Sequence, residues 1–259
     1  MKKYLSIIAN QINITLAYKF SLVSAFMLPL FQVFISIFVW KVIYSNNPMD
    51  INYTLNEMVT YIITSTFISV VYSVSHAFRL TKLVRTGNLS FILIRPYNYL
   101  LESFSFFTGK KVVEGIILFL IFFTLSAAGI IEIGGINLIS VLLLISTYIM
   151  VFLFINLIGI LSFWLIQMWT IKPLFVALVG LLGGTYFPLD ILPSSVYKIL
   201  KYNPFSFIGF VNTKTLLGKF SVEETFVFLT VSICWSFVFI ILTKLLWKKG
   251  LRIYEGMGV

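Results

Sequence analysis

The feature that most constrains this chain is a series of long apolar runs, separated by short segments that carry most of the charge. An α-helix rises about 1.5 Å per residue and the hydrocarbon core of a bilayer is about 30 Å thick, so roughly 20 apolar residues suffice to cross it. Charged residues make up only 11% of the 259 positions, whereas a soluble domain carries about 25%. The sequence therefore predicts an integral membrane protein.

The apolar runs predict an all-α fold with six transmembrane helices in a single transmembrane domain, residues 1–259. The fifth run is short and is interrupted by Gly183, Gly184 and Pro188. No charged residue is expected deep within a span, and Glu114 and Glu132 are interpreted as boundary residues of the third. The predicted spans are residues 20–40, 58–78, 115–131, 138–162, 173–189 and 225–243.

Lys and Arg collect in alternate connecting segments, and this asymmetry indicates the orientation. With the N-terminus inside, fourteen of these residues lie in cytoplasmic segments and four or five lie outside. Both termini are therefore expected in the cytoplasm. The net charge of +10 follows from this distribution, so no nucleic-acid partner is expected.

The residues before the first span have the pattern of an amphipathic helix. Leu5, Ile8, Ile12 and Leu16 recur at helical spacing, while Ser6, Asn10 and Asn13 share another face. Such a helix lies in the plane of the membrane interface. Two interpretations stay open: an N-terminal interfacial helix, or an ordinary extension of the first span.

Residue patterns for catalysis are missing from the sequence. It contains no phosphate-binding G-x-x-x-x-G-K-[ST], so the chain is not expected to bind ATP through such a loop. The single histidine, His76, has no nearby Cys or carboxylate and is interpreted as an interfacial polar group. No cofactor or metal site is predicted. Two functions stay open at this point. They are a membrane-embedded lipid-modifying enzyme and a non-transporting membrane interaction or immunity protein.

The segment 79–114 is expected to be a cytoplasmic loop containing a short helix. Gly87-Asn88 is a turn signal and Pro96 should end the helix near Arg95, which leaves the apolar stretch Leu89–Ile94 between them. An apolar helix flanked by basic residues is suited to docking into a groove of a partner protein. The other interpretation is a basic loop that contacts anionic lipid.

The segment 186–224 is expected to form short helices at the outer surface, because its prolines interrupt two short apolar stretches. The glycines at the end of the fifth span would let that helix break, and broken backbone at membrane depth requires surrounding protein or water. The pattern favours either a lateral gate or a structural turn.

Several of these motifs occur in the same order in a known family. They are Tyr18-Lys19-Phe20, Trp40 to Tyr44, Val84 to Leu89 leading to Leu93-Ile94-Arg95-Pro96, Phe187-Pro188 through Pro193, Asn203-Pro204-Phe205, and the basic tail. In this order of features the chain resembles the ABC-2-type permeases of bacterial ATP-binding-cassette exporters.

The resemblance implies a permease subunit without enzyme activity of its own, in the bacterial cytoplasmic membrane. The implied partners are an ATPase subunit that holds ATP and Mg, a second permease chain (a homodimer or a paired paralogue), and membrane lipid. The cargo is expected to be amphipathic or lipid-like: a lipid, peptide, drug or glycan. The implied ATPase-docking residues of a coupling helix are Arg85, Gly87, Leu89, Phe91, Leu93, Arg95 and Pro96, and those of an outer gate are Gly183, Gly184, Phe187, Pro188 and Pro193.

Overall fold

The computed structural model describes residues 2–46, 53–72, 76–131, 133–165 and 168–254, and within these ranges it contains helices and no strand. Short 3-10 turns at Leu161–Phe163, Met168–Thr170 and Leu189–Ile191 connect some of the helices. The α-helices are α1 Lys2–Ala17, α2 Lys19–Asn46, α3 Leu55–Val71, α4 Ala77–Arg85, α5 Leu89–Leu93, α6 Tyr99–Ala127, α7 Leu138–Ile160, α8 Ile171–Leu182, α9 Ser194–Leu200, α10 Phe210–Leu216 and α11 Val222–Ile253.

Three helices among the described residues are long and apolar enough to cross a membrane: α2, α7 with its 3-10 extension, and α11. Helix α6 has 29 residues and is about 43 Å long at 1.5 Å per residue, but it includes Lys110, Lys111 and Glu114. Helices α3 and α8 are shorter, with 17 and 12 residues. The multi-pass helical class is therefore established, while the number of six spans stays a prediction.

Local sequence fixes where several helices begin. Helices α3, α7 and α11 each start with a capping box, in which Thr54, Asn137 and Ser221 exchange hydrogen bonds with the residue three positions later. These bonds satisfy backbone N–H groups that have no partner inside the first turn. Helix α6 is capped differently, because the side chain of Asn98 accepts hydrogen bonds from the N–H groups of Leu100 and Leu101 at 3.0 and 3.3 Å.

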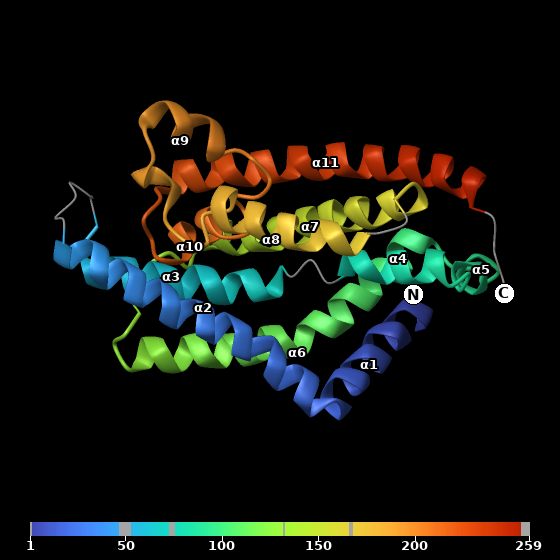
Figure 1. Cartoon of the computed structure of the whole chain (residues 1–259), viewed down its shortest axis with the longest axis horizontal. Coiled ribbons are helices and arrows are strands. Elements are labelled where there is room, and N and C mark those ends of the chain that lie inside the picture. The colour runs from blue at the N-terminus through green and yellow to red at the C-terminus, as the bar shows by residue number, and fades with distance from the viewer. Residues whose placement is uncertain (1, 47–52, 73–75, 132, 166–167, 255–259) are drawn as a thin grey trace.

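The most extensive helix contact joins α7 to α11, and α10 packs against both α7 and α3 (Figure 1). The hydroxyls of Ser146 and Ser232 form a hydrogen bond of 2.6 Å across the α7–α11 interface. Small polar residues of this kind let membrane helices approach closely. Both chain ends, α4 and α5 lie at one end of the molecule, while α9 and α10 lie at the other. The start of α1 and the end of α11 thus lie at the same end of the molecule.

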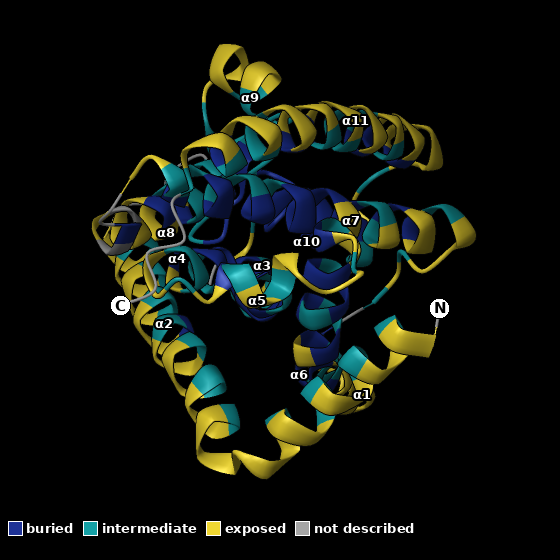
Figure 2. Cartoon of the chain, turned by 90° about the vertical axis from the view of Figure 1, so that its right-hand side faces the viewer, coloured by how far each residue is buried: buried dark blue, intermediate teal, exposed yellow. Residues whose placement is uncertain are grey.

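Helices α1 and α2 form an open V at the edge of the bundle and are mostly exposed (Figure 2). Helix α1 packs along α6 at Gly109, where an added Cβ would lie 2.7 Å from the carbonyl oxygen of Ile8. The glycine is therefore what allows the two backbones to approach. Within α2, Val33 is the only buried residue, so most of this apolar helix is exposed on the surface of the single chain.

Candidate partner-docking and gate sites

The segment proposed to dock a partner is a helix–turn–helix at the end that carries both termini (Figure 1). Helix α4 ends at Arg85, and Gly87 follows with a φ of +70°. This left-handed conformation suits glycine, which has no Cβ to clash with the backbone. Helix α5 then runs from Leu89 to Leu93, and the chain reaches Pro96 before α6 begins. The short helix expected from the sequence is therefore present.

One side of α5 is anchored to the bundle. Leu89 is fully buried and packs in a cluster with Leu80, Tyr99 and Ile160, which belong to α4, α6 and α7. Tyr99 also stacks on Trp247 of α11, with ring centroids 3.8 Å apart. The position of α5 is thus fixed by four longer helices.

The segment after α11 adds a further anchor. The hydroxyl of Tyr254 donates a hydrogen bond of 2.9 Å to the carbonyl of Gly87 and lies 3.2 Å from the hydroxyl of Ser90. Both contacts hold the turn between α4 and α5. The C-terminal segment therefore positions the candidate docking element.

The other side of α5 is open. Phe91 is 65% exposed, Ile94 80% and Leu93 42%. Large apolar side chains that are exposed together form a patch, and such patches mark interaction sites. Of the seven residues implied by the family resemblance, Phe91 and Leu93 face outward and Leu89 faces inward. Arg85, Arg95 and Pro96 are also exposed, and Gly87 is partly exposed.

His76, expected as an interfacial polar group, is buried by protein and has a side-chain partner that the sequence did not indicate. It is buried against the rings of Phe106, Phe107 and Phe152, and its Nε2 lies 2.9 Å from the hydroxyl of Ser103. The partner was invisible in the sequence because 27 residues separate the two side chains. Ser103 is 1% exposed, so this His–Ser pair is closed to any substrate and acts as a buried hydrogen bond.

Glu114, which was expected at a span boundary, lies within a helix and is paired, while Glu132 lies outside the described residues. Helix α6 begins at Tyr99, sixteen residues before the predicted third span, so Glu114 lies inside a continuous helix. Its carboxylate pairs with the ammonium group of Lys111, and both side chains are buried. Lys111 also donates a hydrogen bond of 2.8 Å to the carbonyl of Val70, in the last turn of α3. The i, i+3 spacing of Lys111 and Glu114 was the signal for this pair.

The candidate outer gate begins where α8 ends. The helix ends at Leu182 and the chain turns at Gly183 and Gly184. Of these two glycines, Gly184 has the left-handed conformation, with a φ of +71°. The sequence predicted a break at these two glycines. Both are buried, and a Cβ added to Gly184 would lie 2.9 Å from the Cβ of Phe210. Glycine is therefore required by both the conformation and the space.

The carbonyl groups of this turn are satisfied by other helices. Gly183 accepts from the backbone N–H of Phe210 at 2.8 Å. The carbonyl oxygen of Gly184 accepts a hydrogen bond of 2.5 Å from the hydroxyl of Tyr61. The carbonyl oxygen of Thr185 accepts one of 3.2 Å from the hydroxyl of Ser65. Irregular backbone is tolerated at membrane depth only when protein or water surrounds it. These hydrogen bonds meet that condition, and they hold the turn against α3.

The prolines of the outer segment bracket an ion pair. Pro188 is buried and precedes the turn Leu189–Ile191, Phe187 is partly buried, and the exposed Pro193 precedes α9. Between the prolines, the carboxylate of Asp190 pairs with Lys214 of α10 at 2.7 Å.

Tyr53 completes this contact at the outer end. Its hydroxyl donates to Asp190, at 2.8 Å to Oδ2 and 2.9 Å to Oδ1. Burial, together with the charge of Asp190, raises the pKa of Tyr53 well above its ordinary value, so the phenol stays protonated and remains a donor. The three side chains join the segment before α3 to the outer turn and to α10.

One part of the outer segment differs from its prediction. Helix α10 was expected at the surface, but Phe210–Thr215 are buried between α3 and α7. Asn212 donates to the hydroxyl of Tyr72 at 3.0 Å and to the carbonyl of Phe207 at 2.7 Å. Asn212 looked like a surface residue because its side-chain partner Tyr72 lies 140 residues away in the sequence.

These features define a multi-pass helical membrane protein with an exposed apolar face at one end and an interrupted helix near the other. The sequence profile of the ABC-2 family transporter proteins matches residues 30–258. The chain therefore belongs to the ABC-2 transporter family, which confirms the resemblance drawn from its motifs. A search of curated proteins gave no match.

Proposed function

We propose that this chain is the membrane-spanning permease subunit of an ATP-binding-cassette exporter, and that a separate ATPase subunit docks on α5. The family match supports a transport role. The observation that carries the docking site is the two-sided character of α5, with Leu89 buried in the bundle and Phe91 exposed. ATP and Mg are bound by the ATPase, and this chain binds no cofactor.

The anchoring of α5 supports a conformational mechanism. Because Leu89 packs on α4, α6 and α7, and Tyr254 holds the preceding turn, a displacement of α5 displaces the ends of several long helices together. Closure of two ATPase subunits on ATP would supply that displacement and switch the spans between two states of access. Two permease chains, a homodimer or a paired paralogue, form the path between them. The largely exposed apolar helix α2 is available for lipid and for that second chain.

The outer turn at Gly183 and Gly184 is the proposed exit gate. It is held by hydrogen bonds to Tyr61 and Ser65 and by the ion pair of Asp190 with Lys214. These contacts belong to α3 and α10, so a movement of either helix would release the turn.

We propose an amphipathic or lipid-like cargo. A cavity of about 650 Å³ beside the outer end of α3 has both apolar and charged walls, among them Val59, Glu57, Lys214 and Lys219. Mixed walls of this kind suit a molecule with a polar and an apolar part. The docking end faces the cytoplasm, in accordance with the Lys and Arg distribution, and the membrane is the bacterial cell membrane.

The proposal is tested by co-purification with the ATP-binding-cassette ATPase encoded nearest to the gene of this chain. Phe91→Asp places a carboxylate in the middle of the apolar face, which costs several kcal/mol if it is buried unpaired. We expect assembly to be lost while membrane insertion is retained, because Phe91 lies outside every span. Lys82→Gln should have a mild, salt-sensitive effect, since exposed ion pairs contribute about 0–1 kcal/mol.

Ile199→Asp is the matched control for this experiment. Ile199 is 76% exposed on α9, at the opposite end of the molecule. The same change of an exposed apolar residue to Asp should leave ATPase assembly intact there. If Phe91→Asp still holds the ATPase as well as Ile199→Asp does, α5 is not the docking element and the proposed mechanism is wrong.

A further inference from the structure

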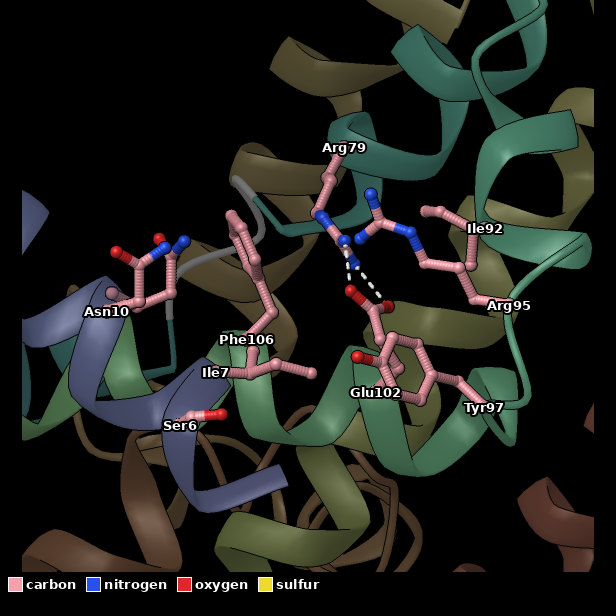
Figure 3. A pocket seen from close by; sticks show the side chains of 10 residues that line it. Ser6, Ile7, Asn10, Arg79, Ile92, Arg95, Tyr97, Glu102 and Phe106 are labelled. Carbon is pink, nitrogen blue, oxygen red and sulfur yellow. Dashed lines mark hydrogen bonds and ion pairs between the residues drawn. The ribbon is translucent and has the colours of Figure 1, made fainter. Parts of the chain in front are cut away.

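A pocket of about 440 Å³ lies at the end that carries the termini, between α1 and the segment that leads from α5 into α6. Figure 3 shows that Ser6 and Asn10 come from α1, whereas Arg95, Tyr97 and Glu102 come from the opposite wall. The volume is that of about 15 water molecules at roughly 30 Å³ each. It lies in the lower part of the range for small-molecule sites.

The pocket carries an excess of positive charge. Arg79 forms a two-pronged ion pair with Glu102, with N–O distances of 2.6 and 3.0 Å. Glu102 is thereby neutralised. Arg95 also lines the pocket, and no carboxylate among the described residues pairs with it. Two guanidinium groups and one carboxylate give the lining a net charge of +1, and Arg95 is exposed and open to a ligand.

The polar groups around Arg95 suit an anion with several acceptor oxygens. Arginine binds phosphate through two parallel N–H groups, a geometry that lysine lacks. Hydroxyl and amide donors line the pocket on Tyr97 and Asn10, whereas the hydroxyl of Ser6 donates to the carbonyl of Lys3 at 3.2 Å. The wall is completed by Ile7, Ile92 and Phe106, so the pocket is charged on one side and apolar on the other.

The position of α1 indicates where such an anion would come from. The helix is amphipathic and none of its residues, Lys2–Ala17, is buried, so its apolar side chains Leu5 and Leu16 are open to a bilayer. A helix of this type lies at the depth of the lipid headgroups. Its start is tied to the other wall of the pocket, because Lys3 donates to the carbonyl of Pro96 and the hydroxyl of Tyr4 accepts from the N–H of Asn98.

We propose that this pocket binds the phosphate of an anionic phospholipid headgroup, with Arg95 as its main ligand. The headgroup fits the cavity and the acyl chains remain in the bilayer beside α1. A bound phosphate bridges α1 to the segment after α5. Where the proposed exporter function holds, lipid binding therefore stabilises the docking helix, but the binding itself does not depend on that function.

The test measures lipid retention by the purified full-length chain without any ATPase, using native mass spectrometry. The probes are phosphatidylglycerol, phosphatidylcholine and inorganic phosphate. We expect retention of phosphatidylglycerol over phosphatidylcholine, and about a tenfold loss in Arg95→Gln, as for a removed charge-assisted hydrogen bond. Arg95→Lys should recover part of the affinity, because it keeps the charge and loses the fork geometry.

Arg85→Gln is the control, because Arg85 is an exposed cation at the end of α4 outside the pocket. It should retain phosphatidylglycerol like the unmodified chain. Equal retention in Arg95→Gln and Arg85→Gln would overturn the proposal. So would binding of inorganic phosphate, but not of phosphatidylglycerol, through Arg95. Loss of ATPase assembly in Arg95→Gln with unchanged lipid retention would assign this arginine to protein docking instead.

Discussion

The buried pair of Lys111 and Glu114 offers a quantitative test of how α6 and α3 are held together. Lys111 binds both the carboxylate of Glu114 and the carbonyl of Val70. Replacing Lys111 by Met leaves Glu114 as an uncompensated buried charge, and breaking a buried pair in this way costs about 3–5 kcal/mol. The carbonyl of Val70 also loses its donor. We therefore expect Lys111→Met to lower the free energy of unfolding by at least about 3 kcal/mol.

The double variant should lose less free energy of unfolding than the two single variants lose together. In Lys111→Met/Glu114→Gln neither charge remains, so the loss reduces to the hydrogen bond that Lys111 donates to the carbonyl of Val70, about 1–3 kcal/mol. Residues in direct contact show coupling energies of this order. We expect a coupling energy of at least about 2 kcal/mol between the two substitutions. The assay is SDS-induced unfolding in bicelles, followed by helical circular dichroism, on the four members of the cycle.

Lys110→Met is the matched control, because Lys110 is exposed on the same helix. Its effect should stay within about 0.5 kcal/mol, as for other surface substitutions. If the substitutions at Lys111 and Glu114 are additive, the two side chains do not form the pair described. If Lys111→Met is as mild as Lys110→Met, the reasoning about buried charge in α6 is wrong.

Three other outcomes are expected. In a Cys234→Ser background, a cysteine placed at Asn137 should react with an impermeant thiol reagent in intact cells, whereas a cysteine at Asn88 should not. The opposite labelling would show that the predicted orientation in the membrane is wrong. The chain purified alone should neither hydrolyse ATP nor be labelled saturably by a photoreactive ATP analogue, since its sequence lacks a phosphate-binding loop. Gly109→Leu should push α1 away from α6 and speed its proteolysis, whereas Gly115→Leu should not, because an added Cβ meets nothing within 4 Å there.

Apolar length predicted the long helices α2, α7 and α11 because a bilayer span demands a nearly uncharged run. The helices themselves extend beyond the runs: α11 continues to Ile253, ten residues past the predicted end of the sixth span. Helix formation does not end where hydropathy falls, since the backbone hydrogen bonds continue into charged segments. The same reason explains α6, whose first sixteen residues were taken for a loop.

Long-range pairing is what the sequence did not reveal. Lys214 was counted among the outer basic residues, yet it is bound to Asp190 and its helix is buried. His76 looked unpartnered, yet it bonds to Ser103. In each case the side chain is polar and its partner lies more than 20 residues away, so composition and periodicity carry no trace of the contact.

The candidate docking site shows most clearly what the local sequence can and does not predict. Gly87 and Pro96 predicted the bounds of a short helix, because both residues act on the local backbone. They did not indicate which side of α5 is free, since five residues are too few for a clear hydrophobic face. That side is decided by Tyr99, Trp247 and Tyr254, which come from other segments and cover Leu89. Because the C-terminal segment sets the free face of α5, removal of that segment should displace α5 even though its own sequence is unchanged.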